Sequence, residues 1–100
     1  MERTGVITFL NIHDYVSNSS GHRYDGCLAE LEQDDAQSVL LYTTSHRLQA
    51  ALIMSYVSKS RVTVSLAERA YVASSEIERR SSSFEGPFTV KAVWNRPAGT

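Results

Sequence analysis

Residues 46–58 constrain the fold of this chain more than any other segment, because they form its only clear helical pattern. Leu48 and Leu52 share one stripe at helical spacing, and polar residues punctuate the chain before and after it. Thr44 or Ser45 can accept a hydrogen bond from a free backbone N–H and so begin the helix. The sequence therefore predicts a single helix near the middle of the chain.

The predicted helix is apolar over much more than one stripe. A second set of apolar side chains widens its hydrophobic surface: Ala50, Ile53, Met54 and Val57. An amphipathic surface helix needs only one apolar stripe toward its core. We therefore expect one side of the helix to pack on a β-barrel and the other side to lie in an interface with a neighbouring subunit.

Strand-like segments surround the helix. Three precede it, at residues 5–12, 23–32 and 38–43, and two follow it, at residues 61–66 and 88–95. Turn-forming residues dominate the connection at 13–22, which predicts a loop. Residues 68–78 fit helix and strand patterns equally. Gly26 inside the second strand predicts a bulge.

This order of elements predicts a mainly β fold with one helix, in a single domain spanning residues 1–100. Three strands, a helix and at least two more strands match the OB-fold, a Greek-key barrel. We expect a five- or six-stranded antiparallel barrel with the helix plugging one end. The alternative is an open α+β sheet with the helix on one face. A ferredoxin-like fold would need a second helix at residues 68–78.

Composition narrows the function classes. The formal net charge is −1, whereas a dedicated duplex-DNA binder has a basic excess. No stretch is long enough to span a membrane. No apolar run follows Met1, so the sequence predicts a cytoplasmic protein unless a leader has been removed. Cys27 is the only cysteine, which excludes an intramolecular disulfide.

The sequence contains no recognisable catalytic set. Cys27 and His22 lack the spacing of a nucleophile–base pair, and Cys27 alternates with apolar residues as a buried structural thiol would. His13, Asp14 and His22 lack a known metal-ligand spacing. We therefore predict a non-enzymatic protein with no metal and no cofactor.

The strand order, the broad apolar helix and the closing Val93-Trp94-Asn95 resemble the B subunits of AB5 bacterial toxins. The resemblance implies an OB-fold homo-oligomer, a pentamer, that binds a cell-surface glycan and can associate with a second toxin-like subunit. It also implies that Trp94 is the platform for a galactose ring. The opposing interpretation places Trp94 in the core, in phase with Phe88 and Val90.

In OB-folds, the connections between strands one and two and between strands four and five flank the ligand-binding face. The corresponding connections here are residues 12–22 and 67–87. We therefore predict a ligand site made of His13, Asp14, Tyr15, Asn18, Tyr71, Trp94 and Arg96. The alternatives are a domain that binds single-stranded nucleic acid, which the balanced charge disfavours, and a protein that acts only through protein–protein contact.

Overall fold

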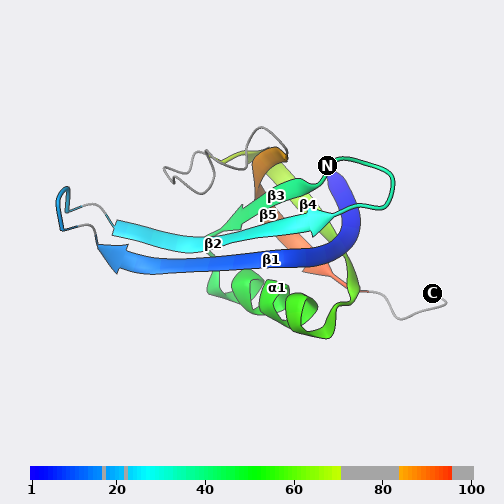
Figure 1. Ribbon diagram of the computed structural model, residues 1–100, viewed down its shortest axis with the longest axis horizontal. Coiled ribbons are helices and arrows are strands. Elements are labelled where there is room, and N and C mark those ends of the chain that lie inside the picture. Colours follow the sequence, from blue (N-terminus) through cyan, green and yellow to red (C-terminus); the bar gives the residue numbers. More distant parts are fainter. Residues whose placement is uncertain (17, 22, 71–83, 96–100) are drawn as a thin grey trace.

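The computed structural model describes residues 1–16, 18–21, 23–70 and 84–95, with only the backbone at 15, 16, 23 and 24. It contains five strands and one helix: β1 (Glu2–Val16), β2 (Arg23–Glu32), β3 (Val39–Thr43), α1 (His46–Ser58), β4 (Arg61–Arg69) and β5 (Glu85–Trp94). The strands close into a barrel in the order β1-β2-β3-β5-β4 (Figure 1). The predicted OB-like barrel is confirmed, and the alternative of an open sheet is wrong.

One strand pair departs from the predicted antiparallel pattern. β3 and β5 are parallel, while the other four pairs of neighbours are antiparallel. The reason is the odd number of strands, since directions cannot alternate all the way around a closed ring of five. The parallel pair forms where β5 inserts between β3 and β4, and it closes the barrel.

The predicted limits of β2 are confirmed, whereas β1 was predicted too short. β1 continues to Val16 through the polar segment that was predicted to be a loop, and there it pairs with β2 in a two-stranded arm that ends at Val16 and Arg23. The arm projects beyond the barrel (Figure 1). Strand pairing there tolerates polar residues because the arm extends past the core. β4 likewise reaches Arg69 and β5 begins at Glu85, so residues 68 and 69 are strand. Residues 71–78 lie outside the described residues.

The core follows the alternation of the strands. The inward side chains are buried in one cluster: Ile7, Cys27, Ala29, Leu31, Val39, Leu41, Leu52, Val62, Val64, Leu66 and Val90. Cys27 is fully buried, as predicted. Leu28 and Leu40 point to the other side of the barrel wall, where they are also buried and pack with Phe84.

The bulge lies in β1 and not at Gly26. The register shifts between Ile7 and Phe9, which makes Thr8 the extra residue. Gly26 stays in register but has φ of 127°, and a Cβ there would lie 2.7–2.9 Å from the ring and hydroxyl of Tyr42. Tyr42 crosses this gap and donates a hydrogen bond to the backbone oxygen of Asp25 at 2.8 Å. The absence of a side chain at Gly26 therefore leaves the space into which Tyr42 packs.

The helix begins and ends where the sequence predicts. Ser45 caps it, because the backbone N–H of Leu48 donates to its Oγ at 3.3 Å. Lys59 ends it in a left-handed conformation, with φ of 56°. Leu52 inserts into the barrel cluster and is fully buried. The helix therefore packs against the barrel through one narrow stripe.

Candidate functional site

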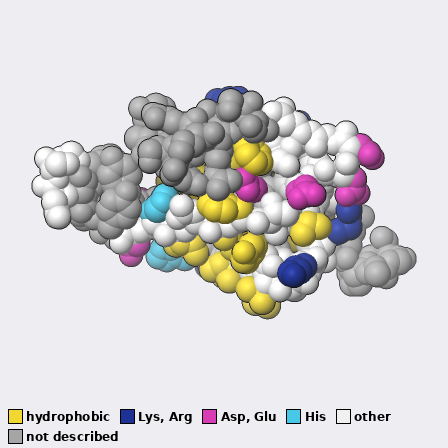
Figure 2. Space-filling model, viewed as in Figure 1, with side chains coloured by type: hydrophobic (Ala, Val, Ile, Leu, Met, Phe, Trp, Pro, Cys, Tyr) yellow, Lys and Arg dark blue, Asp and Glu magenta, His cyan; other side chains and the backbone are white. Residues whose placement is uncertain are grey.

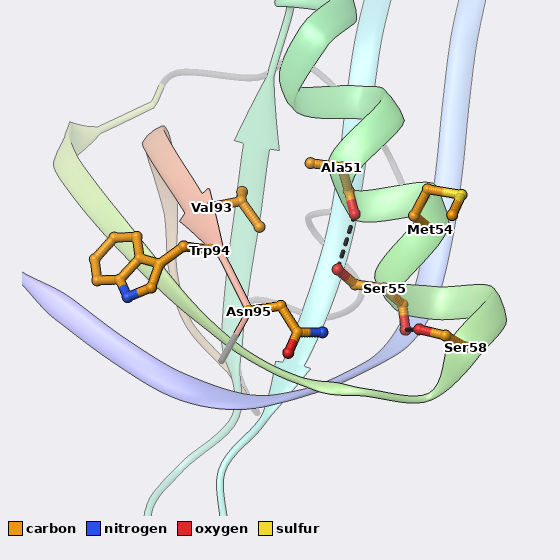
Figure 3. Close-up of a pocket in the computed structure, with 7 residues that line it drawn as sticks. All are labelled: Ala51, Met54, Ser55, Ser58, Val93, Trp94 and Asn95. Atoms are coloured by element: carbon orange, nitrogen blue, oxygen red, sulfur yellow. Dashed lines mark hydrogen bonds between the residues drawn. The ribbon is translucent and has the colours of Figure 1, made fainter. Parts of the chain in front are cut away.

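A cleft of about 300 Å³ lies between α1 and the end of β5 (Figure 3). Its walls come from two elements that are far apart in the sequence. The lining residues are Ala51, Met54, Ser55 and Ser58 from α1, with Val93, Trp94 and Asn95 from the end of β5. The cleft is the place where the closing strand leaves the barrel beside the helix.

A second bulge places Trp94 at this cleft. Leu66 pairs with Val90 and Ser65 pairs with Ala92, so β5 carries one extra residue at Lys91. An extra residue reverses which side chains of a strand face the core. Val93 therefore packs against the barrel cluster, and the interpretation of Trp94 as a core residue in phase with Val90 is wrong.

Trp94 is half-buried, so part of its indole is accessible. Figure 3 shows Val93 pointing toward α1 and the indole of Trp94 turned the other way. The Asn95 amide lies at the end of β5 on the side of Ser58, and Asn95 is exposed. The amide, which both donates and accepts hydrogen bonds, therefore lies on the α1 side of β5, while the indole faces away from α1 at the outer edge of the cleft.

The α1 wall supplies an apolar surface and one polar rim. Ser55 is buried and its Oγ donates to the Ala51 carbonyl at 2.8 Å, so that hydroxyl is engaged within the helix. Ser58 hydrogen-bonds with Ser60 at the end of the helix. Met54 is 69% exposed and forms the apolar part of the wall. None of the seven lining residues is ionisable near neutral pH, so the cleft suits an uncharged ligand.

A second, more polar cleft of about 180 Å³ lies where the arm meets the start of α1. His13 and Asp14, two residues of the predicted site, line it. The other lining residues were not predicted from the sequence: Ile12, Asp25, Gly26, Thr44, His46 and Gln49. The strand register brings Asp25 opposite Asp14, and that register was not readable from the sequence. Among the described residues, no group of three or more His, Cys, Asp or Glu side chains is placed to hold a metal.

The remaining predicted site residues are spread over the chain. Asn18 is exposed at the tip of the arm. Tyr15 lies in β1 opposite Tyr24, and its side chain is outside the described part. Tyr71 and Arg96 lie outside the described residues. The structure therefore brings His13 and Asp14 together in one cleft and places Trp94 in another.

The single thiol of the chain is not among the residues that line either cleft. Burial raises the pKa of Cys27 to about 11, which keeps the thiol protonated at neutral pH. His22, its partner in the rejected nucleophile–base pair, lies outside the described residues. Cys27 is therefore a structural side chain of the barrel core.

Within the part of the chain that the structure describes, no helix has the length and apolar character needed to cross a lipid bilayer. No protein-family model, curated protein or solved structure was found to match this chain.

Proposed function

We propose that this protein is a non-enzymatic binding module that takes a neutral sugar residue at the end of β5, on the accessible face of Trp94 and next to the cleft beside α1. The observation that carries the proposal is the half-buried indole of Trp94, followed by the exposed Asn95 and next to a cleft whose lining residues are not ionisable. The end of β5 thus offers an aromatic surface with a few polar groups nearby, as sites for small ligands usually do.

The groups at and near the end of β5 match the chemistry of a sugar. The C–H face of a pyranose ring packs on an indole, whose flat surface is apolar and electron-rich. The Asn95 amide offers both donors and an acceptor to neighbouring hydroxyls, and Ser58 adds a hydroxyl at the helix end.

Single-stranded nucleic acid is the weaker candidate for this cleft. Its binding combines stacking with cationic side chains that follow the phosphates, and it weakens steeply with salt. Trp94 supplies a stacking surface, but no Lys or Arg lines the cleft. Salt-sensitive binding of oligonucleotides is therefore one of the results that would contradict the proposal in the measurement below.

Trp94 is the only tryptophan, so its fluorescence reports directly on the cleft. Titration with the glycans selected by an array should shift or quench the emission with saturation, and salt should have little effect. By array or calorimetry, Trp94→Ala should weaken binding by at least about tenfold, since loss of an aromatic contact costs on the order of 1.5 kcal/mol. Trp94→Phe should retain part of the affinity.

Tyr56→Ala is the matched control, because Tyr56 is an exposed aromatic residue of α1 that does not line this cleft. It should leave glycan affinity unchanged. Glycan binding that survives Trp94→Ala would contradict the proposal. So would a fluorescence change that occurs only with oligonucleotides and disappears as salt is raised.

A further inference from the structure

The side of α1 that faces away from the barrel is an exposed apolar surface. Of the six large hydrophobic side chains that are exposed among the described residues, four belong to this helix: Ile53, Met54, Tyr56 and Val57. Met54 and Val57 are the most exposed, at 69% and 72%. Figure 2 shows hydrophobic side chains gathered over α1. Such concentration is uncommon on a monomer and marks an interaction surface.

We propose that a second copy of this chain binds on this outer face of α1. The shape of this face favours a second copy. A groove of about 420 Å³ lies between α1 and β1, lined by Val6, Ile7, Thr8, Tyr56, Val57 and Lys59. An apolar helix next to a groove is self-complementary in a two-fold pair, since the helix of one copy fits the groove of the other.

Charge also favours a second copy over a lipid surface. α1 contains no acidic residue, and its nearest cations, Arg47 and Lys59, lie near its two ends. The middle of the exposed face is therefore uncharged, as the centre of a protein interface usually is. A lipid-binding surface instead gathers several cations around its apolar stripe.

The available area indicates how strong the association is. A 13-residue helix is about 20 Å long and about 10 Å wide, so its exposed face has a footprint on the order of 200 Å². A standard interface buries about 800 Å² on each partner. We therefore expect weak association, with a dissociation constant in the micromolar range or above.

Light scattering coupled to size exclusion tests the proposal over a concentration series from about 5 µM to about 1 mM, which brackets the weak affinity expected for a small interface. The wild-type mass should rise with concentration from the 11.1 kDa of one chain toward two or more chains. Val57→Glu should keep the one-chain mass throughout. Gln37→Glu is the matched control, because it adds the same charge at an exposed turn away from α1 and should associate as wild type does.

A labelling measurement keeps the proposal testable if Val57→Glu also disturbs the fold of the single chain. Cys27 is fully buried with a raised pKa, so Val57→Cys introduces a single reactive thiol. Its reaction with a maleimide should slow at least about threefold between the dilute and concentrated ends of the series, as expected when most chains are associated. Gln37→Cys should react at one rate throughout.

Three results would overturn the proposal. The first is a wild-type protein with the mass of one chain at the highest concentration. The second is association that survives Val57→Glu. The third is a monomer that co-sediments with phosphatidylserine vesicles through this face. The proposal is independent of sugar binding, because Val57 does not line the Trp94 cleft, and a Trp94→Ala protein should associate normally.

Discussion

Gly5 lies where the backbone of β1 passes close to the end of β2. A Cβ at this residue would lie 2.1 Å from the backbone oxygen of Glu32. The adjacent Val6 pairs with both Glu32 and Arg61, so β1 turns here from one neighbouring strand to the other. Only a residue without a side chain permits this crossing.

Gly5→Ala should therefore be among the most damaging single substitutions. Because the obstacle is backbone, β1 and β2 would have to separate, and we expect a loss of more than about 3 kcal/mol in unfolding free energy. Gly21→Ala is the control: its Cβ meets nothing within 4 Å, and its φ of 69° costs about 1 kcal/mol. Urea unfolding measures both, and equal losses would show that the crossing is looser than described.

The Cys27 thiol should make stability depend on alkaline pH. Its pKa rises from 9.0 to about 11 on burial. Below about pH 9 both states keep the proton, and the full stability is present. Between pH 9 and 11 the unfolded chain releases its proton while the folded chain keeps it, so stability falls as pH rises, by up to about 3 kcal/mol.

Urea titrations from pH 8 to pH 11 on wild type and Cys27→Ala should show this fall. The variant lacks the thiol, so its unfolding free energy should decline less steeply over the same range. Tyr42 contributes in the same direction in both proteins, because burial and the nearby Asp25 raise its pKa. Parallel slopes for the two proteins would contradict the assignment to Cys27.

The burial of some single residues could be predicted from the sequence, and the surroundings of others could not. The alternation of Cys27 with Ala29 and Leu31 correctly predicted a buried thiol, since it depends only on neighbours in the chain. The bulge predicted at Gly26 and the alternative that placed Trp94 in the core were wrong, because both depend on residues far away in the sequence. Gly26 leaves room for the ring of Tyr42, and an extra residue in β5 turns Trp94 away from the core.

Among the elements, α1 depends on very few contacts with the barrel. Leu52 is its only fully buried large side chain, and it shares the core cluster with Ile7 and Leu66. Most of the helix therefore contributes little to the stability of a single chain. One side chain carries much of its attachment.

Leu52→Ala should cost about 3 kcal/mol, from lost burial and the cavity that remains. Met54→Ala is the matched control on the exposed side, and it should change the stability of dilute protein by less than about 0.5 kcal/mol. Thermal unfolding at low concentration compares the two without contribution from association. Equal losses would mean that α1 packs on the barrel in another orientation.

The elements differ in how far their limits could be predicted. The helix limits were predicted correctly, because its period and its candidate caps, Thr44 and Ser45, are local features, and the structure shows that Ser45 is the cap. β1 was predicted too short, because its polar outer part forms a strand only by pairing with β2. The bulge at Thr8 likewise arises from strand pairing across the barrel. Local sequence carries no direct signal for such pairing.

At the scale of the whole molecule, the arm and the barrel should differ in local stability. In the arm, Asp14 and its partner Asp25 belong to a ribbon of two strands, whereas Ala29 pairs with strands on both sides. A two-stranded ribbon alone is marginal in water. The arm should therefore open more often than the barrel does.

Hydrogen exchange should show this difference. Amides of residues 11–14 should exchange by local opening at least about 10-fold faster than those of residues 28–31, which should approach the global unfolding rate. The difference should be read in dilute protein and again at high concentration. Uniform protection along β1 in dilute protein would contradict an independent arm.

The global arrangement was predictable to the level of class and topology. Strand count, helix position and barrel were readable because each element has its own pattern and short links restrict the connections. The position of the Trp94 cleft could not be predicted from the sequence. Its walls, Ser58 and Asn95, are distant in sequence, and only the closed barrel brings β5 beside the helix.

The insertion of β5 between β3 and β4 has a consequence for synthesis in the cell. The chain emerges from the ribosome from its N-terminus, so β1 to β4 are complete while the place between β3 and β4 is still empty. Both of these strands then expose edges that other chains can pair with. The nascent barrel stays open until the last strand arrives, and this interval is when the protein most needs a chaperone.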